Sequence, residues 1–179
     1  YTKKERYRYM DYSKMKLRHQ LLQFVKLGEM EAYSILGVGS EDIAIEYSAQ
    51  SNTYKWVTQK NGKTVTTGYE VTSGVEQFVH ADDPLFVVID KLRRSLATGT
   101  KATGSILTVA LYLQDEEEPK TASADEQEIS IEFNTFGGSS DNPLTIGYTI
   151  NYSGDPTEGV ATLDYEAKTA TFAPKTTGE

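Results

Sequence analysis

The run of residues 145–152 constrains the fold more than any other segment of this chain. It alternates apolar and polar residues and places Ile146, Tyr148, Ile150 and Tyr152 on one face, which is typical of a half-buried β-strand. The following segment 154–159, Gly-Asp-Pro-Thr-Glu-Gly, is rich in residues that favour turns. We therefore expect a hairpin at 154–159. A return strand over 160–165, a tight turn over 166–168 and a strand over 169–173 would complete a three-stranded meander.

Similar alternation recurs through much of the chain. It predicts strands over 43–47, 68–79, 105–114 and 128–136, whereas residues 115–124 are too polar to pack and are interpreted as a loop. Residues 20–27 fit a helix or a strand by apolar spacing alone. The pattern indicates a mainly β fold, and both 105–114 and 128–136 suit a β-sandwich.

The polar segment 48–68 contains a second hairpin signal. Two β-prone stretches, 54–57 and 64–66, flank Asn61-Gly62, a strong short hairpin signal. We predict a projecting hairpin here, and the alternative is an ordinary exposed loop.

One helix is predicted after residue 83. Asp83 is a good N-cap, Pro84 suits the first helical position, and Gly99 can end the helix. Leu85, Ile89, Leu92 and Leu96 fall on one face, which favours packing against a sheet over a groove for a partner.

Charge is unevenly distributed along the 179 residues. Residues 1–26 contain eight basic and two acidic residues, a net charge of +6, whereas the remainder carries −14. An acidic body repels phosphate, which argues against sequence-specific nucleic-acid binding. We expect a basic arm over 1–17, one domain over 18–174 and a tail over 175–179. The arm could bind an acidic neighbouring copy, or it could be a disordered solubilising or appended segment.

No constellation of catalytic, cofactor-binding or metal-binding residues is predicted. The chain has no cysteine, His19 and His80 lie far apart, no serine occupies a Gly-x-Ser-x-Gly motif, and Gly37-Val38-Gly39 lacks a third glycine. The carboxylates at 115–118 lack the spacing of a calcium loop. We expect a non-enzyme without cofactors, without a signal peptide and without a membrane-spanning segment.

Several short motifs together resemble the major tail tube proteins of long-tailed (siphovirus-like) bacteriophages. They are Arg18-His19-Gln20-Leu21, a turn at Gly28-Glu29, a strand over 33–39 ending in Gly-x-Gly, and the ending with its "GDP.EG" and "TATF" segments. The resemblance favours a strand for residues 20–27. It implies a β-sandwich with one α-helix packed on a sheet and a projecting hairpin, whose subunits stack as hexameric rings into a conduit for DNA ejection. The inner tube of a contractile tail or of a phage-tail-like bacteriocin is a close variant.

The resemblance also implies sites and partners. The hairpin, with Tyr54, Trp56, Lys60, Asn61, Gly62 and Lys63, would reach the next ring. Glu46, Glu128 and Glu132 would line the lumen and repel passing DNA, or else simply face solvent. The expected partners are further copies of the chain, a tape-measure protein and a tail terminator, in the virion tail and, during assembly, in the host cytoplasm. The alternative of another class is a carbohydrate-binding or adhesin-type sandwich with Tyr54, Trp56 and Tyr69 as an aromatic platform.

Overall fold

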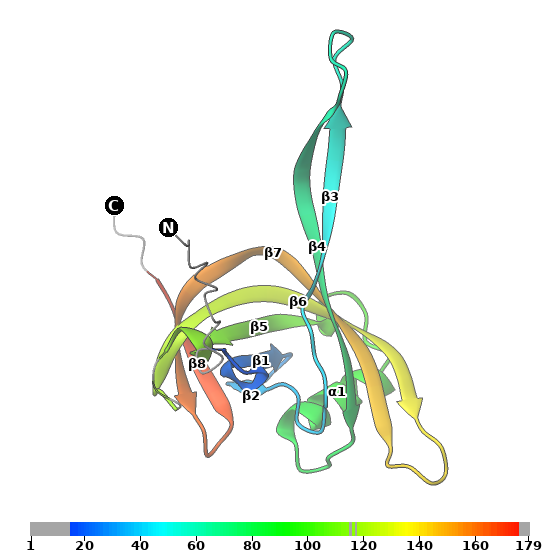
Figure 1. The fold of residues 1–179 in the computed structure, drawn as a ribbon. Helices are drawn as coiled ribbons and strands as arrows, with labels where there is room; N and C mark the ends of the chain where they lie inside the picture. The colour runs from blue at the N-terminus through cyan, green and yellow to red at the C-terminus, as the bar shows by residue number, and fades with distance from the viewer. Residues whose placement is uncertain (1–14, 115, 117, 176–179) are drawn as a thin grey trace, which may run out of the picture.

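The computed structural model describes residues 15–114, 116 and 118–175. Within them the fold is mainly β, with a single α-helix and three short 3-10 helices (Figure 1). The elements are η2 (Arg18–Gln20), β1 (Leu21–Leu27), β2 (Tyr33–Ile35), β3 (Glu46–Tyr54), β4 (Lys63–Phe78), α1 (Pro84–Arg94), η3 (Gly99–Ala102), β5 (Thr103–Ala110), η4 (Leu111–Leu113), β6 (Thr121–Gly137), β7 (Thr145–Asp164) and β8 (Thr169–Pro174).

All the strands belong to one antiparallel sheet, in the order β3-β4-β7-β6-β5-β1-β2-β8. The long strand β7 pairs with β4 through its first half and with β8 through its second half. Because β8 also pairs with β2, the strands β7, β6, β5, β1, β2 and β8 close a small barrel, from which β4 and β3 extend the sheet. The two layers expected of a sandwich are thus parts of one continuous, curled sheet (Figure 1).

Two apolar cores lie on opposite faces of this sheet. On β1, Phe24 belongs to the core inside the barrel, and its neighbour Val25 belongs to the core under α1. The same alternation on β5 sends Leu107 into the barrel and Ile106 towards the helix side. Strands buried on both faces are apolar at successive positions, as they are here.

The predicted helix is confirmed, and its start follows the expected chemistry. The Asp83 carboxylate accepts a hydrogen bond from the Leu85 backbone N–H at 3.1 Å, and Pro84 takes the first helical position. Leu85 and Ile89 are buried against the sheet. The helix ends at Arg94, before the expected Gly99, so Leu96 lies beyond it and is 81% exposed.

The hairpin predicted at 154–159 is wrong, because β7 continues through this segment as one strand. Gly154 has a φ of +68° and begins a bulge of β7, which has three residues, 154–156, between its pairs with Glu128 and Glu126, where β6 has only Gln127. The Gln127 side-chain amide donates to the Gly154 carbonyl at 2.6 Å. Since β6 pairs with β7 on both sides of this bulge, the turn-prone residues bend the strand without reversing it. The later turn between β7 and β8 is as predicted.

Four other boundaries also differ from the sequence prediction. The supposed loop at 121–124 is the start of β6, where Ala122 and Ala124 fill the narrow barrel interior. The strand expected over 43–47 begins only at Glu46 and runs to Tyr54. The strand expected over 33–39 ends at Ile35, and β5 gives way to a 3-10 helix after Ala110.

Candidate assembly surfaces

The hairpin of β3 and β4 projects from the body as an isolated two-stranded ribbon (Figure 1). Every residue of β3 is exposed, and β7 joins β4 only from Thr72 onwards. Trp56, at the tip, is 70% exposed, and Val57 beside it is fully exposed. Two-stranded ribbons are marginally stable in water, and clustered exposed apolar side chains mark contact surfaces. The ribbon therefore exposes apolar side chains that the body of its own subunit does not cover.

The structure brings all six predicted hairpin residues to this tip. Tyr54 ends β3 and Lys63 begins β4, and Trp56, Lys60, Asn61 and Gly62 lie in the loop between them. The loop spans residues 55–62, longer than a two-residue turn at Asn61-Gly62. The Gln59 N–H donates to the Trp56 carbonyl at 2.9 Å, which fixes a turn within the loop.

Within the described part of the chain, β3 and the last part of β6 each have an unpaired strand edge. β3 pairs only with β4, so its outer edge is open. β6 pairs with β5 as far as Ser130, and its remaining residues up to Gly137 pair only with β7. These two free edges bound the segment β3-β4-β7-β6 on opposite sides. Exposed edges present unpaired N–H and C=O groups and invite pairing with another chain.

The three glutamates predicted to line a lumen share one face of this four-stranded segment. Glu46 lies in a cross-strand row with Thr72, Asn151 and Ser130. Glu128 and Glu132 flank Ser130 on the same side of β6, opposite the buried Ile129 and Ile131. Three strand spacings separate Glu46 from this pair, roughly 14 Å.

This face is acidic and is not the face that α1 covers. Glu70 and Glu76 of β4 join the three predicted glutamates on it, since they lie two and four positions from Thr72. The strand stretches that form it, 46–50, 68–78, 128–137 and 145–153, contain no lysine or arginine. We refer to it as the acidic face.

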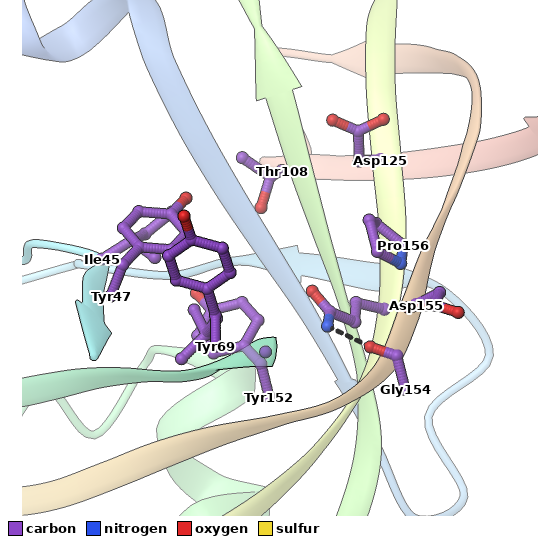
Figure 2. A pocket seen from close by; sticks show the side chains of 12 residues that line it. Ile45, Tyr47, Tyr69, Thr108, Asp125, Tyr152, Gly154, Asp155 and Pro156 are labelled. Carbon is purple, nitrogen blue, oxygen red and sulfur yellow. Dashed lines mark hydrogen bonds between the residues drawn. The ribbon is translucent and has the colours of Figure 1, made fainter. Parts of the chain in front are cut away.

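A groove of about 730 Å³ lies at the base of the hairpin (Figure 2). Tyr47, Tyr69 and Tyr152 line it, together with Asp125 and the Gly154 bend of β7. The Tyr152 hydroxyl accepts a hydrogen bond from the Gln23 side chain at 2.9 Å, and burial raises the pKa of Tyr152.

The aromatic platform proposed for carbohydrate binding is not assembled. Tyr69 lies in the groove and pairs with Ala49, six strand positions from Lys63, so it is roughly 20 Å from the tip that carries Tyr54 and Trp56. The three side chains do not form one surface.

Burial raises the pKa of two groups beside β6, the hydroxyl of Tyr33 and the carboxyl of Asp125. The Tyr33 hydroxyl donates to Glu126, and burial together with that bond raises the pKa of Tyr33 to about 12. Asp125 faces Glu158 across β6 and β7, and desolvation followed by this like charge raises the pKa of Asp125.

Metal-binding clusters and membrane-spanning helices are both absent from the described residues. Within 15–114, 116 and 118–175, no group of three or more His, Cys, Asp or Glu side chains could hold a metal ion. The helices described for the same residues are too short to cross a membrane.

The arm and tail predicted at the two ends lie largely outside the described residues, so the domain limits stay predictions. The domain was expected to begin at residue 18, and the Arg18 guanidinium donates to the Ile43 carbonyl at 2.8 Å there.

Sequence reasoning missed the free edge of β6 and the tyrosine groove. The apolar alternation of 128–136 identifies a strand, but it contains no information about which neighbour that strand lacks. The groove depends on the bend at Gly154, which the sequence suggested was a hairpin.

Comparison with known proteins gives a fold likeness only. No protein-family model and no curated protein matches the sequence. A chain in the tail of an empty GTA particle, refined helically with C6 symmetry, superposes with a TM-score of 0.57 at 10% identity, covering 80% of this chain and 98% of that one. A chain of the anti-feeding prophage baseplate gives 0.48 at 11% identity, covering 80% of this chain and 95% of that one. A chain of the PVC sheath-tube complex gives 0.48 at 10%, covering 86% and 95%. This chain therefore has the fold of a tail component in the GTA particle.

Proposed function

We propose that this chain is the structural subunit of a phage or phage-like tail tube, which polymerises as stacked rings. The observation that carries the proposal is the pair of free edges on opposite sides of the segment β3-β4-β7-β6. The shared fold with a chain from a C6-symmetric tail favours a ring of six.

The strand directions suit ring closure by rotation. The segment contains four strands, and each is antiparallel to its neighbour. Because four is even, β6 of one copy meets β3 of the next in the antiparallel sense, and every copy makes the same contact. Such head-to-tail contacts close rings when the rotation fits.

The two edges are also offset along the strands. Glu46 and Ser130 lie in the same cross-strand row. From this row β3 runs towards the hairpin tip, whereas the free part of β6 runs away from the tip. Neighbouring copies must shift along the strand direction to pair. This shift corresponds to the strand tilt that barrel closure requires.

The acidic face would then line the lumen. α1 and its core occupy the other face, so that face cannot also face the channel. A wall of carboxylates repels the phosphates of DNA and would let DNA slide through without being held.

The hairpin supplies the contact between rings, through the six tip residues already described. A tape-measure protein inside the tube and a terminator at its end are the further partners of this proposal, in the virion tail after assembly in the host cytoplasm. A long flexible tail and the inner tube of a contractile tail would use the same surfaces.

Electron microscopy of the purified full chain over a range of concentrations tests the proposal. We expect rings or tubes at high concentration. Asn134→Pro should abolish them, because Asn134 lies at the bulge of the free β6 edge, outside the ladder with β7, and proline cannot donate a hydrogen bond to a neighbour.

Asn134→Ala is the matched control. It removes the side-chain hydrogen bond from Asn134 to Thr149 but keeps the backbone N–H, so it should assemble. A monodisperse monomer at every concentration would refute the proposal, and so would an Asn134→Pro variant that forms rings as the unmodified chain does.

A further inference from the structure

We propose that the hairpin tip of one copy docks into an acidic pocket at the opposite end of β4 in the copy stacked on it. This inference rests on the proposed function and names the receiving surface of the ring-to-ring contact. The occupant is a second copy of this chain.

The pocket lies at the Phe78 end of β4 and measures about 360 Å³. The residues that line it include Glu41, Asp42, Glu76, Gln77 and Phe78. Phe78 is 37% exposed, and Leu144 next to the lining residue Thr145 is also exposed, so an apolar rim accompanies the charges.

Backbone contacts hold this pocket in shape. The Phe78 N–H donates to the Gly39 carbonyl at 2.9 Å, and the Ser40 hydroxyl donates to the Glu76 carbonyl at 2.7 Å. Gly39 has a φ of +77°, and a Cβ there would lie 2.9 Å from the Phe78 carbonyl. The loop that carries Glu41 and Asp42 is therefore fixed against β4.

The tip has the complementary chemistry. Between Glu46 and Glu70 the charged residues are Lys55, Lys60 and Lys63, so the hairpin carries a net charge of +3. Trp56 is a large exposed aromatic of the kind that anchors interfaces.

The positions of tip and pocket suit stacking. They lie at opposite ends of β4, whose 16 residues span roughly 50 Å (Figure 1). A contact between opposite ends of one molecule is heterologous and repeats without limit along its axis. The tyrosine groove lies at the base of the hairpin, beside the same ribbon whose tip would have to fill it. The groove and the tip are therefore not at opposite ends of the molecule.

Charge reversal on each side tests the docking. The hairpin variant is Lys60→Glu with Lys63→Glu, and the pocket variant is Glu41→Lys with Asp42→Lys. All four side chains are exposed, so folding should not change. Each variant should raise the concentration needed for tube growth by about tenfold or more, since like charges now meet, while rings still form at the sheet edges.

Combining both reversals in one chain should restore tubes, because the attraction is re-formed with opposite signs. Lys101→Glu is the control for charge change alone, since Lys101 is exposed in η3 and belongs to neither surface. Sedimentation and electron microscopy give the readout.

Wild-type tube growth in either reversed variant would overturn the docking and leave the tail-tube proposal standing. Failure of the combined variant to recover tubes would also overturn it. Absence of both rings and tubes in the unmodified chain would instead overturn the proposed function.

Discussion

At the scale of single residues, a polar pair in the helix-side core offers a direct test of the packing. The buried Tyr148 hydroxyl donates to Gln77 Oε1, and the Gln77 Nε2 is already without a partner in the described structure. Tyr148→Phe should lower the free energy of unfolding by about 1–3 kcal/mol, because both polar atoms of the amide would then be unpaired. Urea denaturation measures the change. Tyr148→Phe combined with Gln77→Met should recover much of the loss, and an equally unstable double variant would contradict this explanation.

Tyr33 gives a prediction in pH. Its pKa is raised to about 12 by burial and by the hydrogen bond to Glu126. The raised pKa of Tyr33 contributes fully to the stability of the folded state at pH values below about 10, the pKa of a tyrosine in the unfolded chain. This contribution is lost as the pH rises to about 12. The free energy of unfolding should therefore fall between pH 10 and 12. Tyr33→Phe should flatten this decline in alkaline denaturation, and an unchanged slope would show that Tyr33 does not cause it.

At the scale of elements, the bend of β7 depends on one glycine. Gly154 has a φ of +68°, and a Cβ there would meet no atom within 4 Å, so only backbone strain opposes a side chain. Gly154→Ala should destabilise the fold by about 1 kcal/mol or somewhat more. Gly74→Ala is the control, since Gly74 has equal space and an ordinary φ. Thermal denaturation should separate the two variants, and equal melting temperatures would show that the bend does not need glycine.

The elements predicted correctly are those whose start or apolar pattern depends on residues close together in the sequence. Asp83 and Pro84 fix the start of the helix, and strand alternation identified the Ile146–Tyr152 part of β7. Where pairing with a distant strand decides the outcome, the prediction failed. Gly154-Asp155-Pro156 has turn chemistry, but β6 runs alongside and keeps the strand going. Ala122 and Ala124 look like loop residues, yet a narrow barrel interior requires small side chains. The pocket at Glu41 and Glu76 joins segments that are far apart in the sequence.

At the scale of the whole molecule, the acidic face should govern the passage of DNA without governing assembly. Reversing Glu46, Glu128 and Glu132 to lysine should leave tubes intact but make them retain DNA in a salt-dependent way, because phosphates would then meet a cationic wall. Retention of labelled DNA by sedimented tubes gives the readout. The control variant reverses Glu29, Glu31 and Glu166 to lysine. These three glutamates are exposed and do not belong to the acidic face. Equal retention by both triple variants would place the acidic face outside the lumen.

In the proposed tube β3 of one copy pairs with β6 of the next, and single cysteines can report this contact because the chain contains no cysteine of its own. Single variants Ser48→Cys or Gln50→Cys on β3 would be mixed with the single variant Glu132→Cys on the free part of β6, assembled together and then oxidised. Disulfide-linked dimers are expected in mixtures of a β3 with a β6 variant, and not in either variant alone, since paired strands bring Cα atoms within about 7 Å. Tubes that form in these mixtures without any such cross-link would contradict this pairing.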